Sequence, residues 1–388
     1  MGNRIGSIDI FRGLCIFIMF LSHLGIWWLS SEGYTTLFNW VWQPIARPIA
    51  KGSGFILISG VSVALSYSKK VLNHRDKFSE ETRVWRNNSF IRAIILFIIA
   101  ILINLMITSF DKTAKIFDWW ILITLSISLF FAWPIMRLSL KFRIVLGISW
   151  LIFNFTIQNI LMNYSHLSSM LDFLKDFFYP SDAGQNSILP YFSFFIFGTV
   201  LGSLLARINF EKKANVKEFI KNFTTPLILS AIAAMIFGIL FQYPNFQIAN
   251  TTSFIIFALG LDTLILVGLI TIEKNSRRDF NSKKNPLFYY SYYSLTLFAL
   301  HYIFYPFSFL WSLDFISFWL IFSIALIPFT LFLVFMYKYV SGLFSIKYVV
   351  SMVSEFISVK INEMTFNSEP KAFKNLVSKL KINLVWKV

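Results

Sequence analysis

The sequence predicts an all-α fold: a polytopic membrane protein of about ten transmembrane helices, with both termini in the cytoplasm. The 388 residues are 56% hydrophobic and only 14% charged, with 46 Phe and a mean hydropathy of +0.66. Apolar runs of about 20 residues recur along the chain, which is the length a helix needs to cross the hydrocarbon core. These runs are continuous rather than alternating, which disfavours a β-barrel.

Ten apolar segments qualify as candidate spans. They cover about residues 9–30, 50–68, 90–109, 118–136, 144–163, 188–206, 226–242, 253–273, 287–306 and 315–337. Pro190, Pro226 and Pro286 stand at or just before the starts of three spans, where a missing N–H costs nothing. Pro134 and Pro328 lie inside spans, where proline can kink a helix. The outer loop 164–187 could add a short interfacial helix.

Basic residues divide sharply between the two sides that ten spans define. Of the 35 Lys and Arg, 29 fall on the side of both termini, Arg12 lies within the first span, and five fall on the opposite side: Arg47, Lys51, Lys112, Lys115 and Lys175. The positive-inside rule puts the larger set in the cytoplasm. This distribution accounts for the net charge of +16 without a nucleic-acid partner.

The sequence divides at about residue 340. Residues 1–340 hold the spans, and the first span is expected to be retained because no small-residue cleavage site follows it. Residues 341–388 read as a basic amphipathic cytoplasmic tail. Its end, KAFKNLVSKLKINLVWKV, suits a helix on the anionic membrane surface, with a partly ordered solvated tail as the alternative. The one cysteine, Cys15, excludes an intrachain disulfide.

The first span, IDIFRGLCIFIMFLSHLG over residues 8–25, keeps three ionisable residues. Asp9 and Arg12 are one turn apart, so an i,i+3 pair would explain both at the inner boundary. Arg12 and His23 are eleven residues apart, which puts them on one face, roughly 16 Å apart along the helix. His301 falls at a depth comparable to that of His23, and Asp262 lies near the middle of its span. Ionisable residues inside a span are functional candidates by default.

This arrangement suits a long anionic donor that enters from the cytoplasm. Arg12 or nearby cations would hold its charged or polar part, and its reactive end would reach His23. An imidazole there could act as a general base or carry an acyl group itself. Acyl-CoA fits, because it joins a phosphate-rich head to a long arm that ends in a thioester.

Three alternatives stay open on these residues. His301 could serve only a helix–helix hydrogen bond, and Asp262 could pair with an amide or hydroxyl of a neighbouring helix. His23, Asp262 and His301 could also form the proton relay of a transporter or flippase. A purely structural membrane scaffold is the third.

Four stretches in order resemble a known superfamily. The first is Arg12 to His23 within RIGSIDIFRGLCIFIMFLSH, and the others are GFILISGVSVALSYSKK (54–70), ILPYFSFFIFGTVLGSLL (188–205) and NPLFYYSYYSLTLFALHYIF (285–304). They look like the motifs of the transmembrane acyltransferase superfamily, which includes acyltransferase family 3 and the periplasmic glucan succinyltransferases. Among these groups the chain is most similar to the heparan-α-glucosaminide N-acetyltransferase-like catalytic family.

The resemblance implies that residues 1–340 form a transmembrane acyltransferase domain. This domain would move an acyl group, in the first place acetyl, from cytoplasmic acetyl-CoA or another acyl-CoA to an extracytoplasmic amino sugar or glycan. The residues it assigns to catalysis are His23, Asp9, Arg12 and His301, and those it assigns to the donor are Arg12, Ser59 and Gly60. No metal is implied. The expected partners are acyl-CoA, the acceptor and the lipid bilayer, and a homodimer is an option.

Some features depart from the family pattern. Some heparan-type members place Asn at the position of His23 and use a His in the following outer loop, but residues 24–73 here contain no His. Residue 298 is Phe where Tyr is usual. No large domain precedes the first span, which favours a prokaryotic cytoplasmic membrane and a cell-surface glycan over a lysosomal heparan role. Aromatic residues near the first outer loop could stack on a sugar or form an interfacial belt: Trp27, Trp28, Tyr34, Trp40 and Trp42.

Overall fold

A computed structural model describes residues 5–33, 43–72, 79–110, 114–164, 168–180, 185–208, 216–243, 245–275, 280 and 285–366. These residues fold almost entirely into helices. The α-helices are α1 (Gly6–Trp28), α2 (Ser31–Gly33), α3 (Gln43–Ala50), α4 (Ser53–Tyr67), α5 (Glu80–Phe110), α6 (Ile121–Phe130), α7 (Ala132–Arg137), α8 (Leu140–Tyr164), α9 (Ser169–Phe178), α10 (Ile188–Arg207), α11 (Val216–Phe219), α12 (Thr225–Phe241), α13 (Thr252–Asn275), α14 (Pro286–Tyr292), α15 (Ser294–Leu300), α16 (Phe315–Tyr339) and α17 (Ile346–Phe366). The all-α prediction is confirmed for the described residues.

Shorter helical turns join several of these helices. One π-helical turn, Ser68–Leu72, extends α4, and another, Ile220–Thr224, leads into α12. Three 3₁₀ segments follow α12, α15 and α16, in that order: Asn245–Gln247, His301–Phe309 and Ser341–Phe344. A β-bridge joins Leu29 to Leu313 and ties the end of α1 to the start of α16.

Seven helical segments of the described chain are long and apolar enough to cross a membrane. They are α1, α5, α8, α10, the continuous segment of α11 and α12, α13 and α16. Each coincides with a predicted span, and the chain is accordingly a multi-pass membrane protein. The other three predicted spans, 50–68, 118–136 and 287–306, fall on helices that are shorter or broken. The count of ten and the side of the termini stay predictions.

Local sequence explains two of these irregular spans. Gly52 has a φ of 83°, a left-handed conformation that glycine adopts easily, and α4 begins directly after it. Pro134 has no N–H to bond the carbonyl of Phe130, and the helix breaks between α6 and α7 at Phe131. Pro328, in contrast, lies inside α16, which continues past it.

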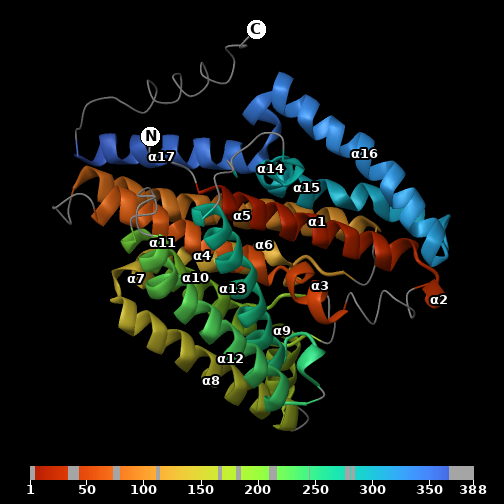
Figure 1. Cartoon of the computed structure of the whole chain (residues 1–388), viewed down its shortest axis with the longest axis horizontal. Coiled ribbons are helices and arrows are strands. Elements are labelled where there is room, and N and C mark those ends of the chain that lie inside the picture. The colour runs from red at the N-terminus through yellow and green to blue at the C-terminus, as the bar shows by residue number, and fades with distance from the viewer. Residues whose placement is uncertain are drawn as a thin grey trace.

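The helices separate into an interior group and a lipid-facing group. In its most apolar stretch α10 is 83% buried, whereas α8 and α16 are each 17% buried. In Figure 1, α16 and α8 lie at opposite edges of the molecule, with α1 between them. The exposed side chains of α8 and α16 include many Ile, Leu and Phe. Such a surface suits contact with lipid tails. The backbone polar groups of these helices are hydrogen-bonded within the helix, as the hydrocarbon region requires.

The interior helices α4 and α10 pack closely through glycines. A β-carbon at Gly60 would clash with the backbone oxygen of Phe195, and one at Gly198 would lie 3.1 Å from the Cα of Gly60. Small residues allow this approach, which drives helix association in membranes. Gly60 therefore holds α4 against α10.

Two segments outside the seven long spans are helical. The loop 164–187 contains α9, which confirms the expected short helix. The segment assigned to a tail begins with the 3₁₀ turn Ser341–Phe344 and continues into α17. Helix α17 packs along α5 and lies beside it in Figure 1. Arg83 Nε donates to Asn362 Oδ1 across that contact at 3.3 Å. The amphipathic end, 371–388, lies outside the described residues.

Candidate active site

A cavity of about 420 Å³ lies among α1, α4, α5, α6, α14, α15 and α17. All three irregular spans contribute to its lining. Irregular helices are tolerated at membrane depth where they line a cavity. The charged and polar part of the lining comprises Arg12, Ser59, Ser62, Ser66, Asn88, Ser89, Arg92, Ser294, Ser345, Lys347 and Ser351. The apolar part includes Ile121, Leu122, Leu125, Leu129, Leu295 and Phe298.

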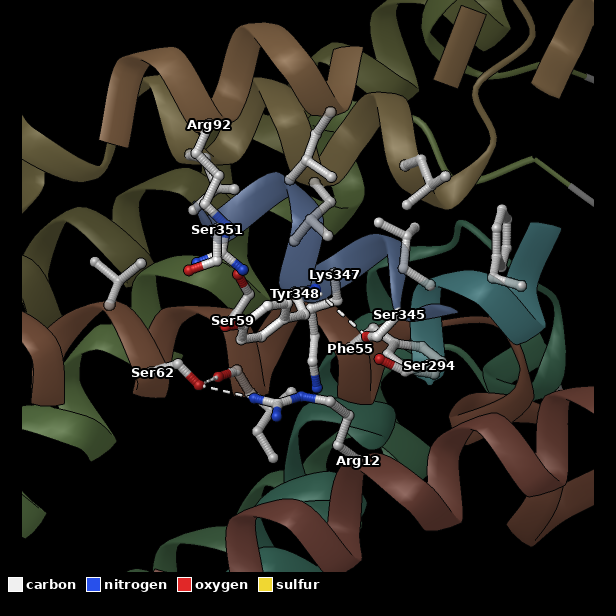
Figure 2. A pocket seen from close by; sticks show the side chains of 18 of the residues that line it. Arg12, Phe55, Ser59, Ser62, Arg92, Ser294, Ser345, Lys347, Tyr348 and Ser351 are labelled. Carbon is white, nitrogen blue, oxygen red and sulfur yellow. Dashed lines mark hydrogen bonds between the residues drawn. The ribbon is translucent and has the colours of Figure 1, made fainter. Parts of the chain in front are cut away.

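Arg12 is fixed in this cavity by neighbours on two helices. Its Nη1 lies 3.2 Å from Asp9 Oδ1, the i,i+3 pair that the spacing predicts. Its Nη2 donates to Ser62 Oγ of α4 at 3.0 Å, as Figure 2 shows. The Asp9 oxygen also accepts from the Ser291 hydroxyl of α14 at 3.1 Å. The pair thus orients the guanidinium while leaving Arg12 on the cavity wall.

The two other residues assigned to the donor take different places. Ser59 lines the cavity beside Ser62. Gly60 faces α10, as described above, and is not in the cavity lining. Gly60 therefore affects the cavity only through the position of α4, which it sets by packing against α10.

Two further cations line the cavity and were not singled out by the sequence. Arg92 extends from α5 and Lys347 from the start of α17, and both point into the cavity in Figure 2. Lys347 Nζ donates to the backbone oxygen of Ser291 at 2.6 Å, so it joins the network around Asp9. In the sequence both residues were counted only among the basic residues on the inner side, so neither was considered as a site residue. The signal for Arg92 was its place at the start of an apolar run.

His23 and His301 lie against each other at the other end of α1. Their ring centroids are 4.8 Å apart, which confirms that the two spans bring them to one depth. Trp27 stacks on His301 with the ring planes 7° apart, and Tyr302 lies 4.2 Å from the same imidazole. Aromatic rings therefore pack against both histidines, with His301 buried and His23 partly exposed.

Hydrogen bonding fixes the tautomer of His301. Its Nδ1 lies 2.5 Å from the backbone oxygen of Phe298, which can only accept, so Nδ1 carries the proton. In the neutral ring Nε2 then has a free lone pair. That atom is buried and has no hydrogen-bond partner among the described residues. It is chemically equipped to accept a proton.

Phe298 lies at the boundary between the cavity and the histidine pair. Its side chain is part of the cavity lining, and its ring centroid lies 5.5 Å from that of His301. Neither His23 nor His301 is in the cavity lining. The cavity and the pair are thus adjacent regions separated by this aromatic residue.

The remaining sequence candidates lie elsewhere. Asp262 is fully buried in α13 and its oxygens make no hydrogen bond within the described chain, although the Ser53 hydroxyl lies nearby. Trp28 is buried against Phe304 and Trp311. Tyr34, Trp40 and Trp42 lie outside the described residues. No group of three or more metal-ligating side chains gathers within the described ranges.

Comparison with known proteins identifies the family. A sequence model of the catalytic region of heparan-α-glucosaminide N-acetyltransferase matches residues 4–242, well over half of the chain. No curated protein and no solved structure matches. The matched residues include α1, α4 and α10, and with them Arg12 and His23. The chain therefore belongs to the heparan-α-glucosaminide N-acetyltransferase catalytic family, a family of membrane acetyltransferases.

Proposed function

We propose that this protein transfers an acetyl group from cytoplasmic acetyl-CoA to an amino sugar or glycan on the other side of a prokaryotic cytoplasmic membrane. One observation carries the proposal: α1 holds Arg12 in the wall of a cavity and, eleven residues on, His23 against His301. The two positions are separated by roughly 16 Å along the helix. A donor with a charged head and a long arm matches that separation.

The distribution of charge supports this orientation. With the N- and C-termini in the cytoplasm and ten spans, the basic residues lie overwhelmingly inside, in keeping with the positive-inside rule. Arg12 then stands near the inner surface and His23 nearer the outer surface. A donor made in the cytoplasm would reach Arg12 first.

The chemistry needs one proton acceptor beside the thioester. The acceptor amine or hydroxyl attacks the acyl carbon, the carbon–sulfur bond breaks, and the proton passes through an imidazole to the leaving thiolate. His23 would serve as this general base or carry the acyl group itself. His301, with its free Nε2, would assist on the acceptor side. Arg12 and Asp9 would hold the donor.

The test uses purified protein in lipid nanodiscs with radiolabelled acetyl-CoA and a panel of amino sugars and membrane glycans. Wild type should form labelled product, and His23→Ala should lower the rate by about 10²–10⁴-fold, the range for loss of a general base. His166→Ala is the matched control, because it makes the same substitution in the predicted loop 164–187 and should leave transfer intact.

Trapping after acid quench separates the two roles of His23. A labelled enzyme that chases into product would assign the acyl-carrier role, and its absence during turnover would assign the base. Wild type that neither binds CoA nor transfers acetyl, but drives proton-coupled solute uptake, would overturn the enzyme proposal in favour of transport.

A further inference from the structure

The cavity brings three cationic side chains together. Arg12, Arg92 and Lys347 are its cationic lining residues, and none of the described lining residues is acidic. Asp9 offsets one charge, through Arg12. Arg12 also lies close enough to Arg92 for like-charge repulsion. Like charges held close together inside a membrane protein are costly, so an anion between them would be stabilised.

The start of α17 adds to this positive region. Ser345 caps the helix through Tyr348 N–H at 3.4 Å, and Thr296 of α15 accepts from Ile346 N–H at 3.0 Å. These bonds hold the positive end of the helix dipole at the cavity. Lys347 lies in this first turn and Ser351 one turn further along, and both line the cavity. All of α17 lies outside the residues that the family comparison matches.

The chemistry of the lining selects its ligand. Guanidinium, ammonium and hydroxyl groups are the donors that phosphate oxygens accept from, and Arg in particular binds them through two N–H groups. The apolar remainder of the lining suits an uncharged chain attached to that phosphate. The expected ligand is thus a phosphate-bearing head on an extended arm.

We propose that Arg92 and Lys347, with the first turn of α17, form a phosphate-binding subsite for the acyl donor. The proposal rests on the function proposed above and deepens it, because it makes α17 part of the donor site. A phospholipid headgroup presents the same phosphate chemistry, so the experiment must separate a nucleotide-linked donor from a lipid.

The experiment measures binding of CoA and of pantetheine, which lacks phosphate, to the full chain in dodecyl maltoside micelles, which also contain no phosphate. Wild type should bind CoA more tightly than pantetheine. Lys347→Met should weaken CoA binding by about tenfold or more, the effect of losing one charged hydrogen bond, while pantetheine binding stays unchanged. Arg92→Lys, which keeps the charge but removes the fork, should have a smaller effect in the same direction.

Lys360→Met is the matched control. It removes a cation from the same helix, but Lys360 is exposed, pairs with Glu363 at 3.7 Å and does not line the cavity. It should bind CoA as wild type does. Size-exclusion profiles and melting temperatures of all variants confirm that a loss of binding is not a loss of folding.

The outcomes are distinguishable. Wild-type affinity for CoA in both Lys347→Met and Arg92→Lys would overturn the subsite while leaving the proposed transfer reaction standing. If wild type does not bind CoA, the donor assignment fails. In that case, binding of phosphatidylglycerol is measured in the same variants. If Lys347→Met abolishes binding of this lipid, the phosphate subsite stands and is assigned to a lipid headgroup. If Lys347→Met leaves lipid binding unchanged, the phosphate subsite is overturned.

Discussion

The two halves of α1 solve the problem of polar groups in a membrane differently. In the first half, Asp9 and Arg12 satisfy each other and are held by hydroxyls of two neighbouring helices. In the second half, His23 lies among rings, with His301 and Trp27 at centroid distances of 4.8 and 5.3 Å. The first half holds a paired charge, and the second half holds an imidazole among aromatic rings.

This difference indicates a division of labour along one helix. The charged head of the donor takes no part in the reaction and needs only to be bound, which the cavity with Arg12 can do. Proton transfer gains from a site that excludes water, because electrostatic interactions strengthen there. Phe298 separates the two regions. Variants in the two halves should therefore affect donor binding and acetyl transfer independently, and this can be tested.

The largest expected effect is on transfer, from the second half of α1. His301→Gln removes the free Nε2 beside His23 and should lower the transfer rate by about 10²–10⁴-fold if His301 shares the proton transfer. CoA affinity should stay at the wild-type value, because His301 does not line the cavity. Steady-state rates and equilibrium CoA binding are the two measurements. Lost CoA binding with unchanged turnover of bound donor would erase the distinction between the halves.

The next effect is on stability, from the first half. Asp9→Asn leaves the Arg12 cation without its carboxylate, although the side chains stay nearly isosteric. Because hydrogen bonds to charged groups contribute about 1.5–3 kcal/mol, we expect the free energy of unfolding to fall by about that amount. Denaturant unfolding in mixed micelles measures it. Asp172→Asn on the exposed face of α9 is the control and should change little. Equal losses in both variants would mean that the pair does not stabilise the fold.

Local spacing explains why the sequence predicted so much of α1. Helical periodicity alone put Asp9 and Arg12 within reach of each other, and counting along two spans put His23 level with His301. Both results follow from regular geometry of 1.5 Å per residue. The same regularity failed at 287–306, which reads as one span but is divided at Tyr293 and tightens into a 3₁₀ segment from His301.

The cavity could not be predicted in the same way, because it depends on contacts between distant segments. Lys347 reaches Ser291, 56 residues away, through a helix that the sequence assigned to a tail. Its charge favoured the cytoplasmic side, but no pattern showed that α17 packs along α5 toward Arg12. The place of Phe298 in the lining, with its ring beside His301, likewise depends on how the helices pack.

A smaller effect is expected at the boundary between the halves. Phe298→Ala removes the ring that separates the cavity from His301, so water should reach the thioester more easily. Acetyl-CoA hydrolysis without an acceptor should rise several-fold when measured at saturating acetyl-CoA. Phe298→Tyr, which keeps the ring, is the control and should not leak. Hydrolysis that stays at the wild-type level in Phe298→Ala would mean that another group closes the cavity.

The smallest expected effect is at the far end of α1, where its second half is anchored. The backbone of Leu313 bonds Trp28 O at 2.7 Å and receives Ser30 N–H at 2.8 Å, and Asp314 next to it caps α16 through Ile316 and Ser317. Hydrogen bonds to the Asp314 carboxyl hold its pKa below the usual value. The Ser317 hydroxyl makes the largest contribution, followed by the backbone N–H groups of Ser317 and Ile316. These hydrogen bonds lower the pKa because they favour the charged form.

A lowered folded pKa has a definite sign for stability. The contribution of Asp314 is present above the unfolded pKa of about 3.9 and disappears as the pH falls through the lower folded value. Asp314→Asn keeps a capping oxygen but cannot titrate. The melting temperature of wild type should therefore exceed that of the variant slightly at neutral pH, and the difference should vanish in acid. Since Asp314 anchors the helix without touching the histidines, transfer at neutral pH should be unchanged. A transfer rate that falls while the melting temperature holds would mean that the geometry of the His23–His301 pair depends on this anchor.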